Sequence, residues 1–399
     1  MSYKVRFFLV FIGMVLFGLA SNFAHPVTPT IIQDLQLHDY MFGVALASMM
    51  VMNFLMSPFW GKINTRISSR LTLLICNCGY GLGQLWFAYA TTELEIIFAR
   101  MFAGLFVGGI MVSFLTYVVN MAKPADQPKF LTYSATIQSV CGAFGYLIGG
   151  VVGEFSVKAA FLMQAALLII TGIVFYLACE SDVSDREPIT AKQLVKQSNP
   201  LQAFMDCRKF MTVSFAMLFA VTILINFGNT GFDQAFNYYL KDQLALTSSY
   251  NGIIKAAVGF VSFVSNMTLC IWIIRKTNVA RSMVVLVGIC TLAGIGALIA
   301  PGIGLFIGFS ILLYAGFSVS MPILQNMVAV QADPSQKNLV MGFFNAMKSL
   351  GGIAGSLTAG FIYSLHAKLP FACTAIIYGI GILAAIGYLT RSKKGMPVK

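Results

Sequence analysis

Four charged side chains lie inside long apolar stretches of this 399-residue sequence: Arg100, Asp233, Lys255 and Lys348. A charge in hydrocarbon is costly, and it is tolerated mainly where it faces a cavity or a partner of opposite charge. Asp233 is the one acid among them, and a carboxyl group that moves between wet and dry surroundings can take up and release a proton. It could equally form a static ion pair with Lys255 or Arg100. The sequence leaves both interpretations open.

Depth separates the three cations. Lys348 lies about nine residues into its stretch, or about 14 Å at the rise of an α-helix, which places it near the middle of a membrane. We therefore expect Lys348 to face a cavity. Arg100 and Lys255 lie about five residues, or about 8 Å, from the end of their stretches, where a long side chain can also reach water.

Uncharged polar residues in the same stretches complete the candidate site. His25 could relay protons, although a lone histidine in a membrane is as often a hydrogen-bonded packing residue. The residues predicted to bind substrate or protons are Asp233, Arg100, Lys255, Lys348, His25, Asn22, Gln138 and Asn345.

The elements that must position these residues are about twelve apolar blocks. Hydrophobic residues make up 58% of the chain and charged residues 10%, a composition that excludes a soluble domain. Blocks of about 20 residues match the thickness of the hydrocarbon layer. Backbone groups in lipid must be hydrogen-bonded within the protein, and these blocks lack the alternation of apolar and polar residues typical of barrel strands, so they must be helices. This predicts an all-α integral membrane protein with twelve transmembrane helices. The blocks are 7–31, 41–60, 71–91, 96–121, 131–153, 158–179, 211–240, 250–274, 282–301, 304–329, 339–363 and 369–390.

The cations predict the orientation. Of the 26 Lys and Arg residues, three lie inside blocks and only Lys158, Lys241 and Lys368 lie on the side opposite the N-terminus, which leaves 20 on the N-terminal side. Cytoplasmic loops carry such an excess, so we expect both termini in the cytoplasm and the first block to be retained as a span. The net charge of +12 then reflects topology and contact with anionic lipid, and does not indicate nucleic acid.

An internal repeat predicts two halves. Gly145 and Gly150 in the fifth block match Gly355 and Gly360 in the eleventh at an offset of 210 residues. We expect two pseudo-symmetric six-helix bundles around a central cavity, with domains 1–179 and 210–399 and a cytoplasmic linker at 180–209.

The same offset relates polar residues of the two halves. It maps Asp233 onto Phe23, close to Asn22 and His25, and it maps Lys348 onto Gln138 as a possible polar pair. Prolines 26 and 29 in the first block, and glycines 228 and 231 in the seventh, could loosen corresponding helices, although a simple packing kink is commoner.

The turn "GKINTRISSR", residues 61–70, resembles the signature G-x-x-x-D-R-x-G-R-R/K of the major facilitator superfamily of secondary transporters. Gly61, Arg66 and Arg70 match, whereas Thr65 replaces the aspartate. In the family this acid helps to latch the halves. We therefore expect a weaker latch, or one built from other groups, and opening distances that respond to Thr65→Asp.

Further motifs resemble the drug:proton antiporter branch of this family. "RMFAG" at 100–104 is similar to its arginine motif, and "GYLIGG" matches its pattern G-P-x-x-G-G except that Tyr146 replaces the proline. "FDQAFNYYLKD" places Asp233 where bacterial quinolone exporters carry a cavity acid, while Ser318 stands where they carry the second. The residues predicted to act in conformational gating are Gly61, Thr65, Arg66, Arg70, Gly145, Gly149, Gly150, Gly355 and Gly360.

The resemblance implies a transporter that works by alternating access, with proton-coupled export of small amphipathic compounds as the leading interpretation. An organic-anion symporter or exchanger that uses Lys255 and Lys348 is the alternative, because cations outnumber acids inside the spans. A non-transporting receptor or scaffold is a remote third. The sequence contains no nucleotide loop, metal cluster or nucleophile motif, so we expect neither an enzyme nor a cofactor or metal. We expect a monomer in a bacterial plasma membrane.

Overall fold

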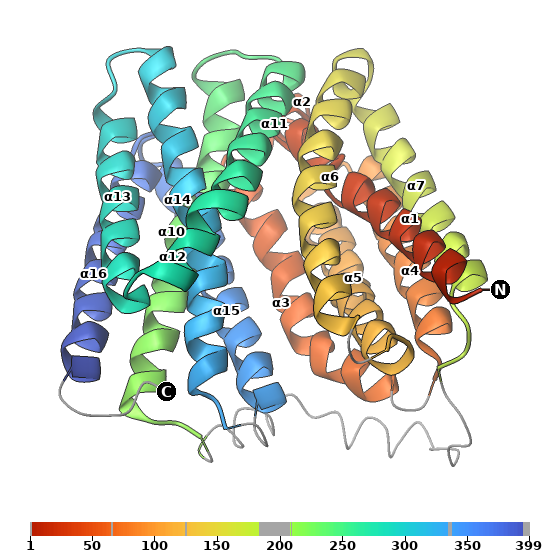
Figure 1. The fold of residues 1–399 in the computed structure, drawn as a ribbon. Coiled ribbons are helices and arrows are strands. Elements are labelled where there is room, and N and C mark those ends of the chain that lie inside the picture. Colours follow the sequence, from red (N-terminus) through yellow and green to blue (C-terminus); the bar gives the residue numbers. More distant parts are fainter. Residues whose placement is uncertain are drawn as a thin grey trace. The chain divides into compact units, whose positions relative to one another are not determined.

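The structure, a computed structural model, describes residues 2–64, 67–123, 126–182, 208, 210–333 and 337–393. These residues are helical apart from short turns, and no strand occurs among them (Figure 1). Each of the twelve predicted blocks coincides with a helix or with a helix continued through a local distortion. By length and apolarity, nine helical segments of the described residues could cross a membrane, accompanied by the shorter apolar segments Met41–Ser57 and Val140–Phe155.

The helices of the first half of the chain follow the six predicted blocks. They are α1 (Tyr3–Asn22), the 3-10 turn η1 (His25–Val27), α2 (Thr28–Asp34), α3 (Met41–Ile63), α4 (Ser69–Tyr89), α5 (Glu93–Met121), α6 (Gln127–Phe155) and α7 (Val157–Ala178).

The helices of the second half follow the same order of spans. They are α10 (Val213–Asp242), α11 (Ser248–Ser265), the π turn η3 (Asn266–Cys270), α12 (Ile271–Lys276), α13 (Val279–Ile299), α14 (Ile303–Gln331), α15 (Lys337–Tyr363) and α16 (Leu369–Lys393).

Polar caps set several helix starts. Thr92 begins α5 with a capping box, in which its hydroxyl accepts the Glu95 amide and the Glu95 carboxylate accepts the Thr92 amide. Asn278 accepts the Arg281 amide at the start of α13, at 3.0 Å. Such caps satisfy amides that have no partner inside the helix, so each span begins at a defined residue.

Two of the spans are distorted, the first where the sequence predicts a loosening and the eighth where it does not. The first is interrupted at His25–Val27, where Pro26 removes a backbone donor. The prediction of a corresponding loosening in the seventh span is wrong, because α10 is continuous from Val213 to Asp242. Gly228 there makes room for the ring of Tyr378, which would lie 2.9 Å from an added Cβ. The unpredicted distortion is the π turn of the eighth span.

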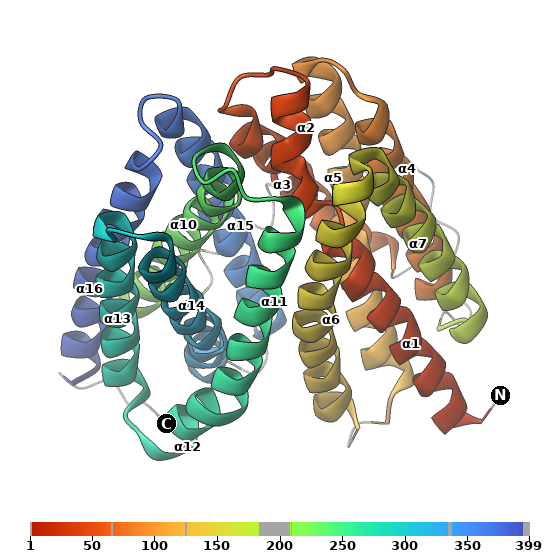
Figure 2. The same cartoon turned by 90° about the horizontal axis from the view of Figure 1, so that it is seen from above.

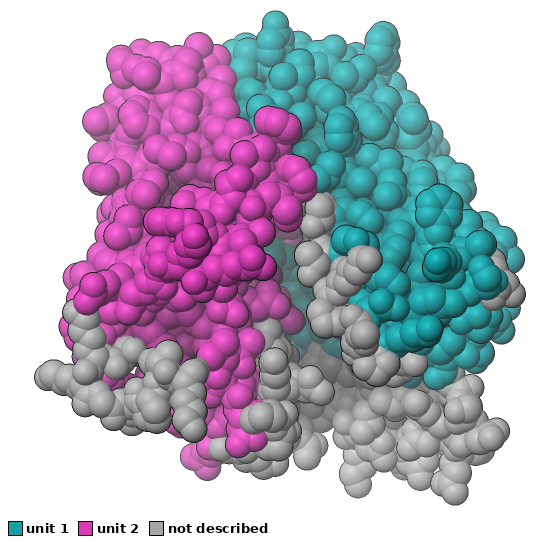
Figure 3. Space-filling model, in the orientation of Figure 1, with its two compact units in different colours: residues 1–37, 48–200, 244–259 teal, residues 38–47, 201–243, 260–399 magenta. Residues whose placement is uncertain are grey.

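The chain divides into two compact units (Figure 3). Unit 1 comprises 1–37, 48–200 and 244–259, and unit 2 comprises 38–47, 201–243 and 260–399. In unit 1, α4 packs on α5 and α7, and α1 packs on α6 and α7 (Figure 2). In unit 2, α10 packs on α15 and α16. Helices α3 and α11 each contribute to both units. Most of the predicted linker, 183–207 and 209, lies outside the described residues.

Glycines of the internal repeat make similar packing contacts in the two halves of the chain. Gly145 of α6 lies against the carbonyl of Leu19 in α1, and Gly355 of α15 lies against the carbonyl of Phe227 in α10. If these contacts are equivalent, Leu19 and Phe227 fix an offset of 208 residues between the first and seventh spans. Asp233 then corresponds to His25, not to Phe23 as the offset of 210 suggests.

Candidate functional site

Asp233 is held by two donors inside unit 2. The hydroxyl of Tyr314, on α14, donates to its Oδ1 at 2.7 Å, and Nδ2 of Asn237, one turn later on α10, lies 3.4 Å from its Oδ2. The Tyr314 ring packs edge-on against Phe232 and Phe236, at centroid distances of 5.7 and 5.8 Å. A carboxyl group is thus fixed between two helices in aromatic surroundings. The Tyr314–Asp233 hydrogen bond joins α14 to α10.

Lys348 also lies in unit 2, on α15. Its side chain is half-buried, and no hydrogen bond or ion pair joins it to another described residue of unit 2. Asn345, also predicted for the site, is exposed less than one turn earlier on the same helix. Lys348 is therefore a cation in mid-span with donors available to a ligand.

Arg100 is buried in unit 1, with 3% of its surface exposed. Its side chain therefore does not reach water, although its distance from the end of the span would permit this. Its guanidinium lies 4.3 Å from the ring centre of Phe87. Its other contacts are weak: Nη2 lies 3.5 Å from Oγ1 of Thr28, and Nη1 lies 3.9 Å from Sδ of Met49. No carboxylate among the described residues of unit 1 forms an ion pair with it. A cation–π contact thus replaces the ion pair that buried arginines usually form.

The sequence did not identify the polar neighbours of Arg100 on α4. Tyr80, Gln84 and Phe87 follow the spacing i, i+4, i+7 and therefore share one face of the helix. Both amide atoms of Gln84 are buried, and its side chain lies within hydrogen-bonding reach of Tyr80. In the sequence, the signal that could have indicated this group was a glutamine at helical spacing between two aromatic residues.

His25, Tyr146 and Lys255 meet in unit 1, although they come from three different spans. The His25 imidazole stacks on the Tyr146 ring at a centroid distance of 5.6 Å and an angle of 16°. The Lys255 ammonium lies 5.6 Å from the centre of the same ring, and Lys255 is 6% exposed. Tyr146, which stands where the antiporter motif has proline, thus joins two predicted site residues that the sequence did not place together.

The remaining polar candidates of unit 1 have local partners. Nδ2 of Asn22 lies 3.1 Å from Oγ of Ser21, and Nε2 of Gln138 lies 3.3 Å from Sδ of Met111. Gln138 and Lys348 belong to different units, so their pairing stays a prediction. The same holds for the pairing of Asp233 with Lys255 or Arg100.

Of the residues predicted for gating, Thr65 and Arg66 lie outside the described residues, and Gly61 lies within α3. The Arg70 guanidinium lies 5.1 Å from the ring centre of Tyr176. Two further residues predicted for gating are glycines of α6: Gly149 meets the Phe23 carbonyl, and Gly150 meets the Ser248 carbonyl of α11.

The last gating glycine, Gly360 of α15, lies against Tyr40, whose carbonyl would be 2.6 Å from an added Cβ, and against Gly43 of α3. The contacts of Gly150 with α11 and of Gly360 with α3 are similar in kind. Small residues at such crossings let helix backbones approach closely.

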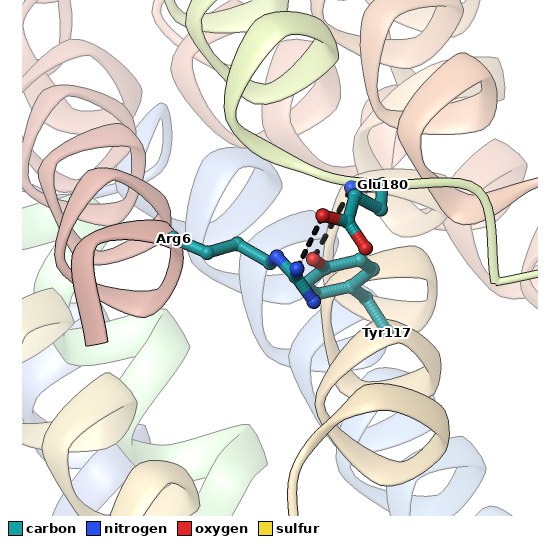
Figure 4. A network of polar contacts seen from close by, with 3 residues as sticks. All are labelled: Arg6, Tyr117 and Glu180. Carbon is teal, nitrogen blue, oxygen red and sulfur yellow. Dashed lines mark hydrogen bonds and ion pairs between the residues drawn. The ribbon is translucent and has the colours of Figure 1, made fainter. Parts of the chain in front are cut away.

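Acidic residues that follow α7 bind the helix ends near the basic turn. The Glu180 carboxylate forms an ion pair with Arg6 of α1, and its amide donates to the hydroxyl of Tyr117 on α5 at 3.3 Å (Figure 4). Asp182 accepts the backbone amide of Ser69 at 2.8 Å and its hydroxyl at 2.6 Å. The segment 180–182 therefore connects α1, α4 and α5.

The family model of the Major Facilitator Superfamily matches residues 10–317 and 218–399 of this chain. Multidrug resistance protein 2 of Bacillus subtilis (strain 168) is 20% identical over 382 residues, 95% of this chain and 94% of that protein. Quinolone resistance protein NorA of Staphylococcus aureus (strain Mu50) is 21% identical over 378 residues, 92% of each chain.

Among solved structures, the human organic anion transporter MFSD10 superposes with a TM-score of 0.70 at 16% identity, over 96% of this chain and all of that one. The likeness shows a shared fold and agrees with the twelve predicted spans. The chain therefore belongs to the Major Facilitator Superfamily and is a membrane transporter with that family's all-helical fold, not an enzyme.

Proposed function

We propose that this chain exports small amphipathic compounds in exchange for protons, and that Asp233 carries the proton. The supporting observation is the carboxylate inside α10 that accepts the Tyr314 hydroxyl at 2.7 Å. A hydrogen bond to a charged group contributes about 1.5–3 kcal/mol, against about 0.5–1.5 kcal/mol for a neutral pair. Protonation of Asp233 would therefore weaken the attachment of α10 to α14, which couples proton binding to helix packing.

The names of the relatives favour export. Two are multidrug and quinolone resistance proteins that cover more than nine-tenths of this chain. The excess of cations on one side supports cytoplasmic termini in a bacterial plasma membrane. We further propose that a monomer is sufficient, because a single chain supplies both halves of the repeat.

Transport by purified protein in liposomes tests the proposal. With an imposed pH gradient and ethidium as a lipophilic cation, the wild type should move ethidium against the proton flow. Asp233→Asn should abolish the effect of the gradient. Asp242→Asn is the matched control, because Asp242 also lies on α10 and also accepts a tyrosine hydroxyl, that of Tyr363 at 2.8 Å. Transport by this variant should still respond to the pH gradient. Gradient-driven transport by Asp233→Asn would contradict the assignment.

An organic-anion carrier is the second candidate, and Lys348 favours it. A mid-span lysine without a hydrogen bond or ion pair among the described residues of unit 2 can bind a carboxylate. In this case the liposomes should exchange small carboxylates without a pH gradient. Lys348→Ala should abolish that exchange and leave the melting temperature unchanged. Proton-driven movement of ethidium without carboxylate exchange would exclude this candidate.

A further inference from the structure

Three exposed cations flank the turn between α12 and α13 in unit 2. Arg275 and Lys276 lie in the last turn of α12, and Arg281 lies in the first turn of α13. No hydrogen bond or ion pair joins any of these side chains to another described residue of unit 2. The sequence between Asp242 and Asp333 contains no acid. The turn therefore carries three positive charges that no carboxylate in the described part of unit 2 binds.

Local hydrogen bonds give this turn a defined shape. The Asn278 side chain accepts the Arg281 amide at 3.0 Å. The Thr277 hydroxyl donates to the Ile273 carbonyl at 2.8 Å, and it therefore accepts from the Ser282 hydroxyl, also at 2.8 Å. These bonds join the end of α12 to the start of α13 and satisfy the backbone there. The charged side chains, and not the backbone amides, are thus the groups available to a partner.

Arg281 occupies a position that helix electrostatics disfavours. The start of a helix carries partial positive charge, so acids are favourable in the first turn, as Glu93 and Glu95 are in α5. The first turn of α13 contains no acid and holds a cation instead. Such a charge lowers the stability of the helix start unless an anion lies close to it. An anionic group from outside the chain would offset this cost.

The corresponding turn of unit 1 contains its own carboxylate. Arg70, which matches Arg281 at an offset of 211 residues, lies 5.1 Å from the ring centre of Tyr176. Beside it, Asp182 accepts the amide and the hydroxyl of Ser69 at the start of α4. The residues after α7 thus supply an anion to the basic turn of unit 1. An external anion would take the equivalent place at the turn of unit 2.

Exposed apolar residues beside these cations favour lipid as the source of the anion. Figure 1 shows α12 as a short helix that leads into the base of α13. It buries Ile273 but exposes Ile271, Ile274 and Trp272, the last to 54%. Tryptophan rings and long cationic side chains are typical of the membrane–water interface, where the ring lies at headgroup level. Free phosphate has no apolar part that such a surface could contact.

We propose that Trp272, Arg275, Lys276 and Arg281 bind the phosphate headgroup of an anionic phospholipid. Each guanidinium group can donate two parallel hydrogen bonds to phosphate oxygens, and the lysine adds a point charge. The indole N–H can donate to the headgroup while the ring faces the acyl chains. Lipid binding at this turn does not depend on which compound the transporter carries.

Quenching of tryptophan fluorescence by brominated lipids tests the site. The full-length protein is placed in phosphatidylcholine bilayers that contain a small fraction of phosphatidylglycerol, with bromine on the acyl chains of one lipid or the other. The part of the signal that Trp272→Phe removes reports the lipids around Trp272. In wild type, phosphatidylglycerol should be enriched there about tenfold or more over phosphatidylcholine, because three cations act together.

Charge variants separate a site from a general effect of net charge. The triple variant Arg275→Gln/Lys276→Gln/Arg281→Gln should abolish the enrichment. Arg281→Gln alone should reduce it about fivefold and serves in place of the triple variant if that protein does not fold. Lys158→Gln/Lys241→Gln/Lys368→Gln is the matched control, because it also removes three cations, but from the side predicted to be opposite. It should keep the enrichment.

The proposal is overturned if the two lipids quench Trp272 equally in wild type. It is also overturned if the triple variant, or Arg281→Gln in its place, keeps the full enrichment, or if the matched control loses it to the same extent. Inorganic phosphate distinguishes the two sources of the anion. If millimolar phosphate removes the enrichment and sodium chloride of the same ionic strength does not, the turn binds free phosphate and not lipid. Enrichment that persists in phosphate supports the lipid site.

Discussion

Asp182 supplies a carboxylate next to the basic turn, where the family's own aspartate is replaced by Thr65. Its two oxygens accept the backbone amide and the hydroxyl of Ser69, the first residue of α4. The first amides of a helix lack partners inside the helix, and the helix dipole favours a negative charge there. This contact lies within unit 1, so it stabilises that unit and does not by itself replace a latch between halves.

Loss of this carboxylate should destabilise the protein measurably. Asp182→Asn removes the charge but keeps an acceptor, and Asp182→Ala removes both, so we expect losses of about 0.5–1 and about 1–2 kcal/mol. Thermal unfolding in detergent would show these as successive decreases in melting temperature. The neighbouring exposed Ser181 is the control, and Ser181→Ala should leave the melting temperature unchanged. Equal melting temperatures for all three variants would contradict the capping role.

At the level of helices, the crossing of α1 and α6 should tolerate no side chain at Gly149. An added Cβ would overlap the Phe23 carbonyl, which belongs to the backbone and cannot rotate away. Gly149→Ala should therefore cost about 1–3 kcal/mol or more. Gly379→Ala on α16 is the matched control, because nothing lies within 4 Å of its added Cβ. It should stabilise the protein by up to about 1 kcal/mol through helix propensity.

Yield of folded protein and melting temperature measure both variants. A Gly149→Ala protein as stable as wild type would show that the α1–α6 backbones can separate without cost.

The sequence predicted the helices well because hydropathy alone determines which segments enter lipid. It predicted their contacts poorly, because a contact depends on which neighbour faces a residue. Gly228 was therefore interpreted as a residue that could loosen its helix, although it makes room for Tyr378. Asp233 was mapped onto Phe23 because the offset came from glycines of the fifth and eleventh spans. Nothing in the sequence indicated that Tyr146 contacts two site residues.

At the scale of the whole molecule, α3 and α11 connect the two units, since each begins in one unit and continues into the other. Near the start of α3, the Asp39 carboxylate accepts the Tyr238 hydroxyl at 2.6 Å. At the end of α10, Asp242 accepts the Tyr363 hydroxyl at 2.8 Å. The Phe42 ring stacks on Tyr238 and meets Tyr363 edge-on. The first bond thus joins the residues just before α3 to α10, the second joins α10 to α15, and Phe42 packs the start of α3 against both tyrosines.

An alternating-access carrier must release and re-form packing at the ends of its spans, so these bonds should limit local opening. In a Tyr238→Phe/Tyr363→Phe double variant, hydrogen exchange at residues 41–47 should rise about 10- to 100-fold, because bonds to charged groups contribute about 1.5–3 kcal/mol each and opening need not break both. Exchange within 50–60 of the same helix should not change.

Tyr378→Phe provides the control for the loss of a phenol, because the Tyr378 hydroxyl is buried and has no hydrogen-bond partner among the described residues. That variant should leave exchange in α3 unchanged. If exchange in the double variant rises equally along all of α3, the tyrosines support the helix as a whole. If it does not rise at all, the aromatic stack around Phe42 is sufficient to hold the junction. Only a rise in exchange confined to residues 41–47, which belong to unit 2, would place the opening at the point along α3 where the chain leaves unit 2 and enters unit 1.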